Sequence, residues 1–144
     1  MRPETAVYRS IKNRLMKYMI KLVRIENSAG IAIPDVYFYT PESEGWIEFK
    51  YIKQMPARAS TTIKIPFRPG QQAWLLDRYN SNPSTLGFLL LAIGNKVFLF
   101  KNNAIKEEYT KDELYSMSTV AKYLSDQSAT LVLYQALLGI TYDA

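Results

Sequence analysis

The chain has 144 residues, about the size of one domain, and 48% of them are hydrophobic, so we expect a single folded domain with a substantial core. It contains no Cys and no His, which excludes disulfides, thiolate zinc sites, and nucleophiles or bases built on either residue. Lys and Arg outnumber Asp and Glu by 18 to 13, and the resulting net charge of +5 suits a polyanionic partner without requiring one.

The start of the chain has the apolar periodicity of a helix, which we place at residues 4–20, with Val7, Ile11 and Leu15 on one stripe. Glu4 lies one turn before Val7 on the same stripe. Glu4 would either point over the sheet as an acid of a metal site or stabilise the start of the helix through its favourable interaction with the helix dipole. The sequence supports both roles equally. Residues 21–26 are predicted to form a strand that leads into a loop.

A β-hairpin is predicted next, with strands at residues 36–40 and 46–52 joined by the turn formers of 41–45. Alternation along the second strand places Glu48 and Lys50 on one face and Phe49 on the other. If the turn takes residues 40–45, Asp35 falls opposite Lys50 and diagonal to Glu48 on that same face. A register slipped by one residue would put Asp35 on the other side.

Two carboxylates that converge beside a lysine are typical of a divalent-metal site. Mg²⁺ prefers oxygen ligands and keeps several waters, so Asp35, Glu48 and the backbone carbonyl of Phe49 would suffice to hold it. Lys50 would then orient or deprotonate an attacking water and offset charge on a phosphate. The alternative is that Glu48 and Lys50 are solvated residues of an edge strand and that Asp35 only opens a turn.

The middle of the chain contains a proline-rich basic loop, a helix and two strands. The loop surrounds a short strand at 62–65, and its basic residues suit a nucleic-acid backbone, although an ordinary solvated loop explains them equally well. In the helix, at 69–80, Gln71 shares a flank with Trp74 and either reaches the site or is a plain first-turn residue. Strands are expected at 87–93, buried on both faces, and at 96–100.

The remaining residues form a C-terminal helical extension, 101–144, in our prediction. A helix is expected at 111–124 with Thr110 as its cap, and another at 133–138. The whole order, α-β-β-β-α-β-β followed by this extension, describes an α/β domain in which a mixed β-sheet is flanked by helices.

Four motifs in this order resemble the PD-(D/E)XK nuclease superfamily. They are the first helix with Glu4, the strand that carries Arg24-Ile25-Glu26-Asn27, the pair formed by Asp35 and the stretch Glu48-Phe49-Lys50, and the segment from Phe67 to Trp74. The resemblance covers residues 4–100 and is strongest to the small VRR-NUC and Holliday-junction-resolvase-like nucleases often found in phage-type genomes. It implies a restriction-endonuclease-like core.

The resemblance also implies a function and a set of roles. Asp35 and Glu48 would bind catalytic Mg²⁺ or Mn²⁺, Glu4 would complete the metal shell, Lys50 would assist the attacking water, and a glutamine would lie beside them, with the choice between Gln71 and Gln72 open. The activity would be that of a Mg-dependent endodeoxyribonuclease selective for branched DNA such as a Holliday junction, working as a homodimer. DNA-backbone contacts would come from Arg24, Asn27, Lys53, Arg58, Lys64 and Arg68.

Several alternatives stay open at this stage. A flap or single-strand endonuclease, an enzyme acting on RNA, and a nuclease-like module that binds DNA without cutting it would all carry these motifs, and one or two metal ions would serve. The sequence has no run of about 18 apolar residues and no signal-peptide pattern. We therefore expect a cytoplasmic protein without a membrane partner, located in the host cytoplasm if the source is viral.

Overall fold

The computed structural model describes residues 2–25, 34–82 and 86–139. Its elements, in chain order, are α1 (Pro3–Met16), β1 (Lys21–Arg24), β2 (Val36–Tyr39), β3 (Glu44–Ile52), β4 (Ile63–Lys64), α2 (Gln71–Ser81), β5 (Leu86–Ile93), β6 (Lys96–Lys101), the 3-10 turn η1 (Asn102–Ala104), β7 (Glu108–Tyr109), α3 (Lys111–Met117), β8 (Val120–Tyr123) and α4 (Ala129–Leu138).

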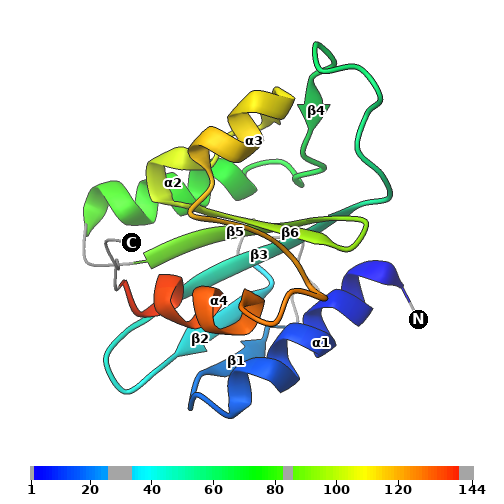
Figure 1. Ribbon diagram of the computed structural model, residues 1–144. Helices are drawn as coiled ribbons and strands as arrows, with labels where there is room; N and C mark the ends of the chain where they lie inside the picture. The colour runs from blue at the N-terminus through cyan, green and yellow to red at the C-terminus, as the bar shows by residue number, and fades with distance from the viewer. Residues whose placement is uncertain (1, 26–33, 83–85, 140–144) are drawn as a thin grey trace.

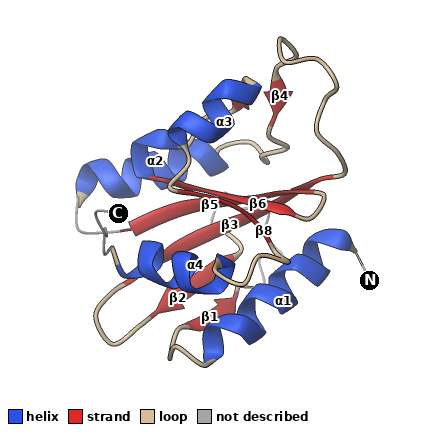
Figure 2. Ribbon diagram, viewed as in Figure 1, coloured by secondary structure: helices blue, strands red, loops and turns tan. Residues whose placement is uncertain are grey.

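A mixed six-stranded sheet lies at the centre of the molecule, with strand order β1-β2-β3-β5-β6-β8. The pairing of β3 with β5 is parallel and the other pairings are antiparallel. Helices α1 and α4 cover one face, while α2, α3 and the small β4-β7 sheet cover the other (Figures 1 and 2). The predicted fold class, a mixed β-sheet flanked by helices, is confirmed.

Helix α1 forms because its apolar stripe packs against the sheet. Ile11 and Leu15 are each 1% exposed, and burying one such side chain contributes about 1.5–3 kcal/mol. The helix ends at Met16 rather than at the expected residue 20, and Met19 reverses the chain with a φ of +62°. The following strand ends at Arg24.

The hairpin that carries the two predicted acids has a shorter turn than expected. The Thr40 hydroxyl accepts hydrogen bonds from the backbone N–H groups of Glu42 (3.0 Å) and Ser43 (2.9 Å), so the turn closes within residues 40–43. Glu44 and Gly45 therefore belong to β3. Gly45 is required there because a Cβ would lie 2.2 Å from the Leu86 carbonyl oxygen of the neighbouring strand.

This turn corrects the predicted register. Val36 pairs with Ile47, which places Asp35 beside Glu48 and not opposite Lys50. The shift amounts to two residues, and because side chains alternate with a period of two, it leaves Asp35, Glu48 and Lys50 on the same face of the sheet. The three side chains therefore lie on one face of the sheet as predicted, although the predicted register was wrong.

The C-terminal part contains a strand where we predicted helix. Helix α3 begins after Thr110 as expected, with the Thr110 hydroxyl accepting from the Glu113 N–H in a capping box, but it ends at Met117. Residues 120–123 instead form β8, which pairs with β6 and buries Val120. The prediction of helix to residue 124 is wrong because the open edge of β6 offers backbone partners that local propensity does not reveal.

Three smaller differences follow from contacts that are distant in sequence. The expected strand at 62–65 has only the two residues of β4, which pair with β7, a strand we did not predict. Helix α2 begins at Gln71 because Gly70 has a left-handed φ of +85°. Helix α4 begins at Ala129, earlier than expected.

In the described parts of the chain, no helix is long and apolar enough to cross a bilayer.

Candidate active site

The two predicted acids lie next to each other at the end of the β2–β3 hairpin. Asp35 immediately precedes β2 and Glu48 lies in β3. The backbone N–H of Asp35 donates a 3.2 Å hydrogen bond to Oε1 of Glu48, so the main chain of one acid holds the side chain of the other. Two carboxylates from neighbouring strands are thereby fixed on one face of the sheet.

Glu48 is completely buried, which is unusual for a carboxylate. Nε2 of Gln71 donates to its Oε1 at 3.0 Å and to its Oε2 at 3.3 Å, and Nζ of Lys50 lies 3.4 Å from Oε2. Burial and then the neighbouring Asp35 carboxylate raise the pKa of Glu48 to about 8, although Lys50 acts in the opposite direction. The pocket around Glu48 therefore favours an additional positive charge.

Lys50 is held in a defined position on the same face. It is 8% exposed, and its ammonium group lies between the Glu48 carboxylate and the ring of Phe67, 5.9 Å from the ring centroid. The sequence did not single out Phe67 for this role, because its proximity to Lys50 depends on the path of the proline-rich loop. Lys50 is thus constrained beside Glu48.

The segment before α2 closes the site from the other side. The backbone N–H of Arg68 donates to Oε1 of Gln71 at 2.8 Å, and Nη2 of Arg68 lies 3.7 Å from Oδ1 of Asp35. Gln71 is completely buried and is the glutamine that contacts Glu48, whereas Gln72 turns away and donates to the Ile105 carbonyl at 3.0 Å. Gln71, and not Gln72, is therefore the glutamine that lies beside Glu48.

Glu4 approaches the same region from the first turn of α1. With Asp35, Arg24 and the rings of Tyr8 and Phe49 it lines a small hollow. Burial raises the pKa of Glu4, as does Asp35, while Lys50 and Arg24 act in the opposite direction. Of the buried side-chain polar atoms that the structure describes, the Tyr8 hydroxyl is the one without a hydrogen-bond partner. It was not predicted as a site residue.

The residues present fit a hydrated divalent cation better than a fully coordinated one. Within residues 2–25, 34–82 and 86–139, no three acidic, His or Cys side chains lie close enough together to coordinate one metal ion. Mg²⁺, however, is commonly bound by one or two carboxylates together with several waters. The acids Asp35 and Glu48 supply that pair, and the Asp35 N–H holds the Glu48 side chain beside Asp35.

The predicted DNA-contacting residues are spread over a wider area. Arg68 reaches the acids, and the guanidinium of Arg24 lies 5.2 Å from the Tyr8 ring centroid at the small hollow. Lys64 is paired with Glu108 at 3.9 Å on the exposed β4-β7 sheet. Lys53 and Arg58 are exposed in the loop after β3. Asn27 lies outside the described residues, so its predicted role is not addressed by the structure.

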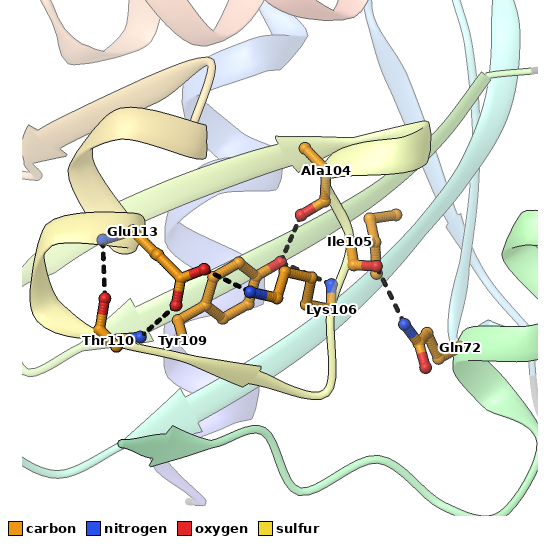
Figure 3. A network of polar contacts seen from close by, with 7 residues as sticks. All are labelled: Gln72, Ala104, Ile105, Lys106, Tyr109, Thr110 and Glu113. Atoms are coloured by element: carbon orange, nitrogen blue, oxygen red, sulfur yellow. Dashed lines mark hydrogen bonds and ion pairs between the residues drawn. The ribbon is translucent and has the colours of Figure 1, made fainter. Parts of the chain in front are cut away.

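A polar network connects the start of α2, through Gln72, to the segment from Ala104 to Glu113 (Figure 3). The Tyr109 hydroxyl donates to the Ala104 carbonyl at 2.6 Å and accepts from the Lys106 N–H at 2.7 Å. Lys106 is also ion-paired with Glu113, and Gln72 anchors α2 to Ile105. Residues beyond the predicted 4–100 core therefore help to position the glutamine that contacts Glu48.

We expect Tyr109→Phe to lower the free energy of unfolding by about 1–3 kcal/mol, because a partly buried donor and a partly buried acceptor each lose their partner. Urea denaturation followed by circular dichroism measures the change. The matched control is Tyr123→Phe, at a tyrosine that is 55% exposed, where we expect a change within about 0.5 kcal/mol. Equal stability of the two variants would contradict a stabilising role for this network.

Comparison with solved structures identifies a similar fold. The chain is similar to Hjc, a Holliday junction resolvase from the hyperthermophilic archaeon Archaeoglobus fulgidus, with a TM-score of 0.58, 13% sequence identity, and coverage of 79% of this chain and 93% of that one. At this identity the likeness establishes a shared fold, which is the restriction-endonuclease-like fold that the PD-(D/E)XK resemblance implies. No family model matches the sequence, and neither does any curated protein. Membership of the VRR-NUC branch stays a prediction.

Proposed function

We propose that this protein is a divalent-metal-dependent endonuclease that cuts branched DNA. The observation that carries the proposal is the buried Glu48 carboxylate, held among Asp35, Lys50 and Gln71 on a fold shared with a Holliday junction resolvase. Burying a carboxylate costs several kcal/mol unless its charge is compensated, so a protein that retains this group gains something other than stability from it. Hydrolysis of a phosphodiester is the chemistry for which these groups are suited.

In the proposed mechanism the chain's own residues bind and orient the reacting groups. Asp35 and Glu48, with Glu4 and the Phe49 carbonyl as further ligands, would hold Mg²⁺ or Mn²⁺, and the bound ion would supply Lewis-acid chemistry for phosphodiester hydrolysis. Lys50, fixed between Glu48 and Phe67, orients the attacking water by hydrogen bonding. Gln71 keeps the Glu48 carboxylate in one rotamer by donating to both of its oxygens.

Substrate binding is proposed to rest on backbone contacts and DNA shape. Arg68 is 46% exposed in its side chain and lies 3.7 Å from Asp35, which places its charge where the scissile phosphate would approach. Arg24, Lys53, Arg58 and Lys64 would add contacts that do not read base sequence. A homodimer, which would place two sites on one junction, stays a prediction.

The testing experiment measures cleavage of end-labelled four-way junction, flap, single-strand and duplex DNA in Mg²⁺, in Mn²⁺ and in EDTA. We expect metal-dependent cutting with the four-way junction cut fastest, and loss of cutting in Asp35→Asn. The variant should retain junction binding in EDTA, because Asp35 carries negative charge and repels the DNA backbone. Binding without cutting by the wild-type protein in both metals would refute the proposal in favour of a non-cleaving DNA-binding module.

A further inference from the structure

Four aromatic side chains continue the active-site face of the sheet away from the two acids. We call Tyr37, Tyr39, Trp46 and Trp74 the aromatic row. Tyr37 pairs directly with Trp46 across β2 and β3, one alternation step beyond Asp35 and Glu48, so the row begins about 6.6–6.8 Å from the acids on the same face. Trp74 extends it from α2, with ring centroids 5.3 Å from Trp46.

The rings of the row are not stacked face to face on one another. Tyr37 meets Trp46 at an interplanar angle of 61°, Trp46 meets Trp74 at 82°, and Tyr37 and Tyr39 are tilted by 30° at a centroid distance of 6.0 Å. Tyr39 is 40% exposed and the other three are partly exposed. By contrast, buried Tyr109 stacks on Phe100 at 4.3 Å. The row therefore retains aromatic surface available to a ligand.

Cations lie on both sides of the row. Arg78 lies over the Trp74 ring, 5.5 Å from its centroid, and Lys21 of β1 pairs directly with Tyr39, which puts its side chain on the same face. Glu44 accepts a hydrogen bond from the Tyr37 hydroxyl and so orients the Tyr37 ring. Its carboxylate lies at the end of the row, next to Tyr37. Flat aromatic surfaces flanked by cations are the combination that binds single-stranded nucleic acid.

We propose that the aromatic row binds unpaired bases of the DNA strand next to the cleavage point, an inference that rests on the proposed function. Its start beside Asp35 and Glu48 gives it the position that bases adjoining a scissile phosphate would occupy. A second copy of the chain fits less well. Val23 and Tyr39 are the described large hydrophobic residues that are exposed on this face, whereas a stable interface needs about 800 Å² per partner. The row would accordingly hold bases that are unpaired, or that become unpaired when the protein binds, at the branch point of the DNA.

Tryptophan fluorescence tests the proposal directly, because both tryptophans of the chain belong to the row. Titration with an oligo(dT) of about 12 nucleotides in EDTA should quench this fluorescence, and a blunt duplex of the same length should quench it at least about tenfold less effectively at equal concentration. Tyr37→Leu and Tyr39→Leu should each weaken oligo(dT) binding by about five- to a hundredfold. Tyr123→Leu, at an exposed tyrosine on the opposite sheet edge, should leave it unchanged.

Measuring oligo(dT) affinity in EDTA tests this inference separately from the nuclease proposal, because binding without metal requires no cleavage. Tyr39 is exposed, so Tyr39→Leu keeps the test valid even if Tyr37→Leu fails to fold. Wild-type oligo(dT) affinity in a folded Tyr39→Leu variant, or no quenching by oligo(dT), would overturn the proposal whether or not the protein cuts DNA. Loss of a dimer in sedimentation, with oligo(dT) affinity intact, would assign the row to self-association instead.

Discussion

Glu48→Gln is expected to reduce metal-dependent DNA cleavage by about 10³-fold or more, since in the proposed mechanism it removes a carboxylate that would bind the metal and stabilise the transition state by several kcal/mol. Its free energy of unfolding should change by no more than about 2 kcal/mol. The substitution removes the ion pair with Lys50, but it also removes the cost of burying a charge whose pKa is already raised to about 8. A glutamine oxygen still accepts from Gln71 and from the Asp35 N–H.

Single-turnover cleavage of the preferred DNA in Mg²⁺ and in Mn²⁺ gives the rate, and urea denaturation gives the stability. Glu42→Gln is the control, since it is the same substitution at an exposed turn residue away from the site. Glu48→Ala is a poorer choice, because it leaves two buried donors unsatisfied and confounds activity with folding. A Glu48→Gln protein that keeps more than a tenth of the wild-type rate would remove Glu48 from the mechanism.

The convergence of the two acids was predictable because it depends on local periodicity. Alternation in β3 fixes Glu48 and Lys50 on one face whatever the partner strand does, and a two-residue error in the register left Asp35 on that face as well. The register itself was not predictable from strand propensities. It depends on the side-chain hydrogen bonds of Thr40, which close the turn early and return two residues to the strand.

Other parts of the site depend on contacts that local patterns do not encode. Which glutamine reaches Glu48 is decided by where α2 begins, and that start is set by the left-handed backbone of Gly70. Phe67 lies near Lys50 and Tyr8 lies against Phe49 through packing between segments distant in sequence. Strand β8 likewise forms because the backbone of residues 120–123 pairs with the open edge of β6. This tertiary pairing outweighs the helical pattern of the residues before it.

Lys50→Met is expected to reduce the cleavage rate by about 10²–10³-fold, the range for loss of one preorganised hydrogen-bond donor at the reacting atoms. DNA affinity in EDTA should fall by less than about tenfold, because one buried charge adds little to the field of the exposed cations. Methionine is unbranched and apolar, so it replaces the apolar stem of the lysine while removing its charge. Lys122→Met, on β8 at the far edge of the sheet, makes the same charge change and should retain wild-type activity.

The pH dependence of this variant separates two roles for Lys50. Lys50 lowers the pKa of Glu48, so its removal raises that pKa further in the metal-free protein, where metal binding then competes with protonation of Glu48. If Lys50 served only to keep Glu48 ionised, raising the pH and saturating the protein with Mg²⁺ would favour the ionised carboxylate and restore the rate to near that of the wild type. If Lys50 acts on the attacking water, as we propose, the defect persists at high pH because deprotonating Glu48 does not replace the missing ammonium group. Rate profiles of both proteins against pH at saturating Mg²⁺ therefore decide whether Lys50 is a catalytic group or a counter-ion.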